Sequence, residues 1–278
     1  MRILKTLTDL DQWRHSLDTD LGFVPTMGAL HEGHLSLIRK AKAENDTVIV
    51  SIYVNPTQFN NPEDLAKYPR TIEADLDLLR SVSTDAVYLP STEDLYPQAV
   101  ESDDYSFGPI EKVMEGSYRA GHFQGVATIV HRFFDLIKPV RAYFGEKDFQ
   151  QLQIIKELVF QKKLPIQIIP VAISREDSGL ARSSRNERLT EDQRRNAAVI
   201  FRSLEYAREH WSEQTVNETV LNMKSMFRDL EDAQVEYIQF VDETSLQQVD
   251  DWSDAEHVRA FIAVFFGEVR LIDNLPIF

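Results

Sequence analysis

Two histidines, His31 and His34, stand three residues apart in the sequence GFVPTMGALHEGH, residues 22–34. A short apolar run breaks there into a loop containing Gly28 and Gly33, and an apolar-periodic segment follows. This pattern predicts a strand, a turn and the start of a helix. The first N–H groups of a helix lack backbone partners and lie at the positive end of the helix dipole, so the position favours a phosphate group. We predict that both imidazoles donate to the same phosphate oxygens.

Two other interpretations of these histidines remain open on the motif alone. They could be ordinary surface residues, or two ligands of a metal ion on one face of a helix. The metal site is less favoured because the chain has no cysteine and only five other, scattered histidines. A P-loop is excluded, since no glycine-lysine-serine/threonine sequence follows.

Two further polar clusters each follow an apolar run. Asn55 and Gln58 lie in NPTQF, directly after TVIVSIYV at 47–54. Their amides suit the hydroxyl or carboxylate groups of a small substrate, although Asn-Pro is also a common turn.

In FGEKDFQQ, residues 144–151, Lys147 offers a cation to phosphate oxygens. Asp148 either caps the next helix or hydrogen-bonds a ribose.

A fourth cluster, SSRN at 183–186, lies in a polar stretch. Its hydroxyls and guanidinium could close over a triphosphate, although ordinary linkers share this composition. Arg119 and His122 in SYRAGHFQG are lesser candidates, which would either flank an active site or cap a helix.

Alternating elements position these clusters. After His34, the residues Leu35, Ile38 and Ala41 share one helical face. Further along the chain, apolar patterns predict helices at about 72–81, 126–137 and 148–161, and strands at 47–54, 85–90, 141–144 and 165–174. Right-handed crossovers between such strands build a doubly wound, Rossmann-like parallel sheet of the α/β class. Ligands bind beyond the carboxyl ends of its strands, where His31, Asn55 and Gly145 fall.

The pattern changes past about residue 175. Helices are predicted at about 191–210 and 214–230, a strand at VEYIQFV, and a hairpin over RAFIAVFFGEVRLIDN that turns at Gly267. We therefore predict a catalytic domain over 1–175 and a smaller α+β lid domain over 176–278.

Charge and composition exclude several classes of protein. The net charge is −15, and residues 190–278 hold 18 of the 45 acidic residues but only 8 of the 30 basic ones. This argues against a nucleic-acid partner and places the phosphate chemistry upstream. No apolar run approaches the roughly 20 residues of a membrane helix, and no signal peptide is recognisable, so we expect no membrane association and a cytoplasmic location. The lack of cysteine excludes disulfides and thiol catalysis.

Taken together and in this order, PTMGALHEGH, NPTQF, GEKDFQQ and SSRN resemble the pantoate-β-alanine ligase (pantothenate synthetase) family of the HxGH nucleotidyltransferase superfamily. HEGH alone would support only the superfamily. The resemblance implies ATP-dependent condensation of pantoate with β-alanine in two steps. Pantoate first forms pantoyl adenylate and releases pyrophosphate, and the amine of β-alanine then displaces AMP. No covalent protein nucleophile is needed.

The resemblance also implies roles for individual residues. Catalysis falls to the phosphate-directed groups His31, His34, Lys147, Ser183, Ser184 and Arg185. ATP is bound by Met27, His34, Gly145, Lys147, Asp148, Ser183, Ser184 and Arg185, and pantoate by Gln58 and Gln151 with Met27 as an apolar wall. Magnesium bridges the phosphates, with Asp75 as a candidate ligand. The family suggests a homodimer.

One position departs from the family pattern. Arg182 stands where relatives carry an apolar residue, so it either adds phosphate affinity or points to solvent. Two rival functions remain: another adenylyl or cytidylyl transferase of the superfamily, and a protein that binds nucleotide without turnover. The second is disfavoured because simple binding needs fewer phosphate-directed groups.

Overall fold

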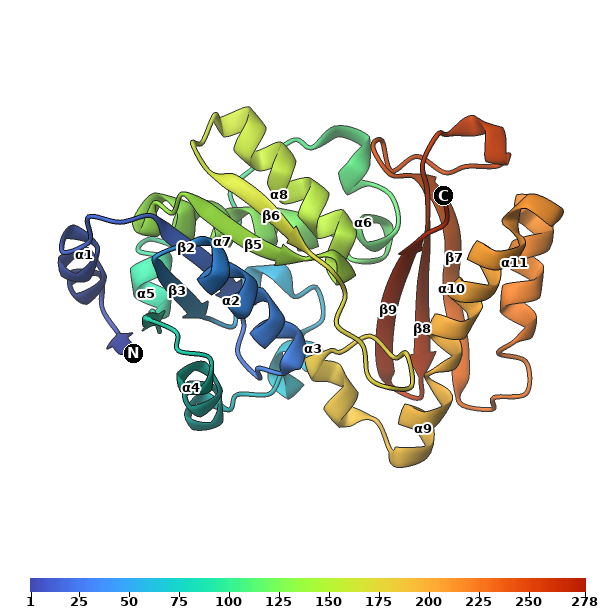
Figure 1. Ribbon diagram of the computed structural model, residues 1–278, viewed down its shortest axis with the longest axis horizontal. Coiled ribbons are helices and arrows are strands. Elements are labelled where there is room, and N and C mark those ends of the chain that lie inside the picture. The colour runs from blue at the N-terminus through green and yellow to red at the C-terminus, as the bar shows by residue number, and fades with distance from the viewer.

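Six parallel strands form the larger sheet, in the spatial order β1-β4-β3-β2-β5-β6. Figure 1 labels four of them, β3, β2, β5 and β6. The computed structural model describes residues 1–278. The strands are β1 (Arg2–Leu4), β2 (Leu21–Thr26), β3 (Thr47–Ile52), β4 (Ala86–Tyr88), β5 (Arg141–Gly145) and β6 (Gln167–Val171). The chain runs outward in one direction from β2 and in the other from β5, so the topological switch point lies between these two strands. Ligands of doubly wound sheets bind at that point, at the carboxyl ends of the strands.

Helices cover both faces of this sheet because successive side chains of a strand point to opposite sides. On β2, Phe23 packs against Phe133 and Phe134 of α7 (His122–Ile137), with ring centroids 5.6 and 6.4 Å away. The same core contains residues of α1 (Leu7–His15) and α8 (Phe149–Lys162). The neighbouring Val24 belongs to the opposite core, with α2 (Glu32–Glu44) and α4 (Ile72–Ser81). The prediction of a doubly wound α/β sheet is confirmed.

Short elements follow several strands and line the carboxyl edge of the sheet. They are the 3-10 turns η1 (Pro56–Gln58), η2 (Gly108–Glu111) and η3 (Glu146–Asp148), and the helices α3 (Pro62–Lys67), α5 (Thr92–Leu95) and α6 (Glu115–Tyr118). The predicted helix at 126–137 begins four residues earlier, at His122.

The C-terminal unit is a three-stranded antiparallel sheet of β7 (Ala233–Asp242), β8 (Val258–Phe266) and β9 (Val269–Pro276). The β8–β9 hairpin turns at Gly267, whose φ of +56° favours glycine, as predicted. Ile238 packs in a core with α10 (Val199–His210) and α11 (Val216–Ser225). The adjacent Tyr237 points the other way and joins the core of the large sheet. Figure 1 accordingly shows the small sheet between the N-terminal unit and these helices.

The segment predicted as one helix over 191–210 is two, α9 (Glu191–Asn196) and α10. Ala197 and Ala198 between them have ψ values of −16° and −19°, typical of a 3-10 turn, and the Ile200 N–H bonds three residues back to Ala197. The predicted domain boundary at 175/176 falls in the connection between the two sheets.

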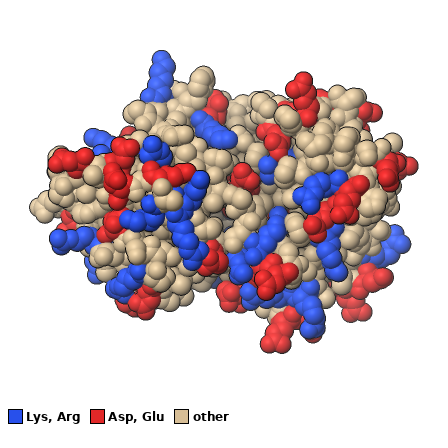
Figure 2. All heavy atoms as spheres, in the orientation of Figure 1, with Lys and Arg blue, Asp and Glu red and all other residues tan.

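Charged side chains of both signs are interspersed on the face seen in Figure 2. None of the helices has both the length and the apolar character that crossing a membrane requires.

Candidate active site

The histidine pair forms the start of α2 and holds a defined tautomer. His31 is the N-cap residue, and its Nδ1 accepts the Gly33 N–H at 3.1 Å. Nδ1 of His34 accepts the His31 N–H at 3.3 Å. Each ring therefore uses Nδ1 as an acceptor, and in the neutral ring the proton is on Nε2. A Cβ at Gly33 would lie 2.9 Å from the His31 ring, so a side chain there would displace it.

Burial keeps both rings neutral. It lowers the pKa of His31 to about 4, assisted by the charges of Lys147 and Arg182. It lowers the pKa of His34 to about 3, assisted by His31 and Lys147. The ring centroids are 4.1 Å apart. At neutral pH the pair therefore presents two uncharged N–H donors beside the helix terminus.

Asp75, the predicted magnesium ligand, accepts hydrogen bonds from the turn before α2 and from Thr71. Its Oδ2 accepts the Ala29 N–H at 3.0 Å, and its Oδ1 accepts the Leu30 N–H at 2.8 Å and the Thr71 hydroxyl at 3.2 Å. The side chain is buried, and it lines neither of the two cavities described below. Asp75 therefore supports the turn that delivers the histidines, and its magnesium role stays a prediction. No cluster of three or more His, Cys, Asp or Glu side chains is placed to hold a metal ion.

Lys147 and Asp148 lie in η3, directly after β5. The Lys147 Nζ is 3.6 Å from Asp148 Oδ1. Asp148 makes no capping hydrogen bond to α8, so the capping alternative is excluded. Asn274 of β9 donates from Nδ2 to the carbonyls of both Glu146 and Lys147, at 2.9 Å each. The C-terminal sheet thus holds the turn that carries the lysine.

The predicted pantoate-binding residues Gln58 and Gln151 lie in η1 and α8, and both line the sheet-edge cavity described below. Gln58 is buried, its Nε2 lies 2.8 Å from Met27 Sδ, and its Oε1 accepts from Asn55 at 3.3 Å. Asn55 also donates to the Gly125 carbonyl of α7 at 3.0 Å and accepts from Tyr96, so it fixes η1 in place.

The serine-arginine segment forms the 3-10 turn η4 (Ser184–Arg188), capped by Ser183. Ser184 donates to the Ala29 carbonyl at 3.1 Å, which joins this turn to the loop before α2. Arg185 bonds Asp64 of α3 at 2.8 Å, and Arg188 bonds the other carboxylate oxygen at 3.2 Å. Burial raises the pKa of Asp64, but the two arginines outweigh it and hold the pKa below its ordinary value.

Two adjoining cavities contain these groups. The sheet-edge cavity, of ≈ 240 Å³, is lined by all of the predicted site residues except Asp75, together with Arg182. Arg182 donates from Nε to the Arg175 carbonyl at 3.2 Å. The interdomain cavity, of ≈ 500 Å³, lies between α3, α6, η4 and the C-terminal sheet. The two cavities share Arg119, Lys147, Asp148, Ser183 and Arg185.

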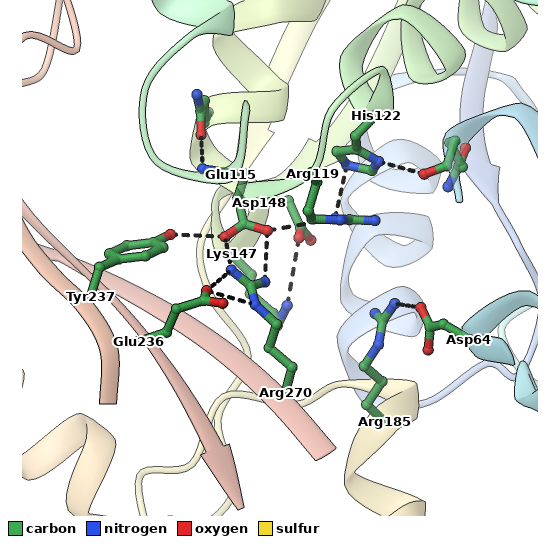
Figure 3. A network of polar contacts seen from close by, with 12 residues as sticks. Asp64, Glu115, Arg119, His122, Lys147, Asp148, Arg185, Glu236, Tyr237 and Arg270 are labelled. Atoms are coloured by element: carbon green, nitrogen blue, oxygen red, sulfur yellow. Dashed lines mark hydrogen bonds and ion pairs between the residues drawn. The ribbon is translucent and has the colours of Figure 1, made fainter. Parts of the chain in front are cut away.

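A polar network on the wall of the interdomain cavity contains residues that sequence reasoning missed (Figure 3). Glu115 of α6 accepts two hydrogen bonds from Arg270 of β9, at 2.7 and 2.8 Å, and one from the Tyr237 hydroxyl of β7 at 2.9 Å. Arg270 also bonds Glu236 at 2.6 Å. Burial opposes ionisation, but Arg270 prevails and lowers the pKa of Glu115 to about 2. No local motif marks these residues.

His122 connects this network to the sheet-edge cavity. Its Nδ1 donates to the Gln58 carbonyl at 2.8 Å, and its Nε2 accepts from Arg119 Nη1 at 3.0 Å. Burial, assisted by the charge of Arg119, lowers the pKa of His122 to about 3, so the ring is neutral.

Comparison with known proteins agrees with this geometry. A family model described as pantoate-beta-alanine ligase matches residues 2–276. The pantothenate synthetase of Bacteroides thetaiotaomicron is 45% identical over 278 residues, which cover 99% of this chain and 98% of that protein. The one from Christiangramia forsetii is 46% identical over 258 residues, covering 92% of this chain and 91% of that protein.

Solved structures are similar over the whole chain. Pantothenate synthetase from Thermus thermophilus superposes with a TM-score of 0.93 at 39% identity and covers 100% of both chains. Pantoate-beta-alanine ligase from Francisella tularensis, complexed with beta-gamma ATP and beta-alanine, has a TM-score of 0.82 at 38% identity, covering 99% of this chain and 97% of that one.

Proposed function

The chain belongs to the pantoate-beta-alanine ligase family, and from this premise we propose that it condenses pantoate with β-alanine through a pantoyl adenylate. The observation that carries the proposal is the neutral histidine pair at the start of α2, in one cavity with Lys147, Gln58 and Gln151. Phosphate-directed donors and amides for a hydroxy acid thus lie within a single site.

The first step needs charge stabilisation rather than a protein nucleophile. A carboxylate oxygen of pantoate attacks the α-phosphorus of ATP, and the bond to the bridging oxygen of the β-phosphate breaks, releasing pyrophosphate. We assign the Nε2–H groups of His31 and His34 and the ammonium of Lys147 to the phosphate oxygens, where negative charge develops. The side chains that contact the β- and γ-phosphates come from η4 and its cap, and they are Ser183, Ser184 and Arg185. When ATP binds, Arg185 gives up its hydrogen bond to Asp64 and bonds a phosphate oxygen instead.

Gln58 and Gln151 orient pantoate in the same proposal, with Met27 as the apolar wall. Gly145 and Asp148 line the adenosine end, where Asp148 bonds the ribose. In the second step the neutral amine of β-alanine attacks the acyl carbon, the bond to the phosphate oxygen breaks, AMP leaves, and the amine loses a proton to solvent.

Magnesium enters this proposal as part of the ATP substrate, bound to phosphate oxygens and water. Asp75 is left out of this proposal, since backbone N–H groups and the Thr71 hydroxyl already bond both of its oxygens. Formation of a homodimer and a cytoplasmic location remain predictions, and light scattering of the purified protein tests the first.

The test is an assay of the purified protein with MgATP, pantoate and β-alanine. We expect AMP and pyrophosphate to form only when pantoate is present, and pantothenate only when both substrates are. Release of ADP, or AMP formation that does not depend on pantoate, would refute the proposal. ATP binding without turnover would favour the non-catalytic nucleotide-binding alternative.

A further inference from the structure

Six cationic side chains line the interdomain cavity. Four of them form a hydrogen bond or a close ion pair with a carboxylate, and a fifth has an assigned role. Arg185 and Arg188 each bond one oxygen of Asp64. Arg270 lies between Glu115 and Glu236, Lys67 pairs with Glu268 at 3.3 Å, and Lys147 is assigned to phosphate above. The remaining cation is Arg119.

Arg119 is held on one side only. Its Nη1 donates to His122 at 3.0 Å and lies 3.5 Å from Glu115 Oε2, whereas Nε and Nη2 have no hydrogen-bond partner in the chain (Figure 3). Glu115 already accepts three hydrogen bonds from Arg270 and Tyr237. The side chain of Arg119 is only 19% exposed. A largely buried guanidinium with free N–H groups favours an anionic ligand, because a carboxylate satisfies both the charge and the planar donor edge.

The position of Arg119 narrows the choice of anion. It lines both cavities, so it lies where they join. Through His122 it is tied to the backbone of Gln58, at the end of the sheet-edge cavity that we assign to pantoate. The groups assigned to phosphate come from the start of α2, from η3 and from η4. A second substrate that enters through the wider interdomain cavity would meet Arg119 on its way to the acyl carbon.

We propose that Arg119 binds the carboxylate of the amine substrate and so selects an amino acid over a simple amine, an inference that rests on the proposed function. His122 and Glu115 are its positioning residues. The neutral His122 ring accepts one N–H and so fixes the plane of the guanidinium, which leaves the opposite edge for the carboxylate.

The test compares two acceptor amines in Arg119→Ala and Arg119→Gln. β-Alanine carries the carboxylate, and propylamine has a similar chain without it. Loss of one partner of a buried charged pair predicts a fall in kcat/KM for β-alanine of roughly 30-fold or more. For propylamine we expect a change below about threefold, so the preference for β-alanine should collapse. Arg119→Gln retains a donor toward His122, so it separates loss of charge from loss of packing.

Two further measurements identify the source of any loss. Pantoate-dependent exchange of labelled pyrophosphate into ATP, without amine, reports adenylation alone and should be unchanged in both variants. An equal fall in this exchange would overturn the proposal, since Arg119 would then serve the phosphates, as would an equal fall for both amines. Absence of exchange in the wild-type protein would instead refute the proposed function.

Lys67→Ala is the matched control, because it removes one positive charge from the same cavity at an exposed position. We expect its preference between the two amines to stay within about threefold of wild type. A β-alanine-specific loss as large as that of Arg119→Ala would show that the general field of the cavity selects the carboxylate, and would overturn the assignment.

Discussion

Replacing Glu115 with glutamine should destabilise the protein in a pH-dependent manner. Glu115 is only 7% exposed and joins α6 to the C-terminal sheet through Arg270 and Tyr237. Its pKa falls from the ordinary 4.5 to about 2, against the effect of burial, because Arg270 stabilises the charged form. That difference corresponds to about 3 kcal/mol of folding free energy at pH 7.

The pH dependence has a definite sign. A carboxyl group whose pKa is lower in the folded state stabilises the protein fully above the unfolded pKa, here 4.5, and loses that effect as the pH falls toward 2. The free energies of unfolding of wild type and Glu115→Gln, measured with urea, should therefore differ by about 3 kcal/mol both at pH 7 and at pH 5. The difference should shrink to roughly half of that value at pH 3.

Asp77→Asn is a suitable control, because the Asp77 side chain is 77% exposed in its pair with Arg80. We expect its effect on unfolding to stay below about 1 kcal/mol at any of these pH values. A Glu115→Gln difference that does not vary with pH, or that is below about 1 kcal/mol at pH 7, would refute the electrostatic account of this network.

Three other substitutions test the site. His34→Ala should slow pantoate-dependent pyrophosphate exchange at least about 100-fold, which is the usual effect of losing a donor to a developing anion. Circular dichroism should show an intact fold. A normal exchange rate would contradict the assignment of His34 to the phosphates. Gln58→Ala should chiefly raise the KM for pantoate, and an unchanged pantoate dependence in steady-state assays would contradict its role. Asp75→Asn should lower the melting temperature and the exchange rate, because an amide cannot replace both acceptor oxygens. The magnesium concentration for half-maximal activity should stay unchanged, and a large rise in it would support Asp75 as a metal ligand.

Local pattern was sufficient to predict most of the large sheet and the clusters at its edge. The strand before His31 and the helix after it follow from apolar periodicity, and the glycines mark the turn between them. The tautomer of the histidines was beyond the sequence, since it depends on which backbone N–H each Nδ1 accepts. The three-residue strand β1 is too short to show a period and is defined only by its pairing with β4.

Tertiary contacts explain the remaining differences. Asp75 is one of several acids near α4, and only the folded chain shows that its carboxylate meets the Ala29 and Leu30 N–H groups, more than 40 residues away in sequence. Glu115 and Arg270 are 155 residues apart and lie in no motif. Arg119 and His122 were recognised as candidates, but their connection to Gln58 depends on how α7 packs against η1.

The two hydrogen bonds from Asn274 affect when the site can become complete as the chain is synthesised. Translation completes the turn that carries Lys147 long before it reaches Asn274, which lies 127 residues further along the chain. A nascent chain can therefore assemble the parallel sheet and its histidine pair while the turn that carries Lys147 still lacks its hydrogen bonds from Asn274. The ribosome must first deliver the last strand, so we expect catalytic competence to arise late in biosynthesis, after the large parallel sheet has emerged.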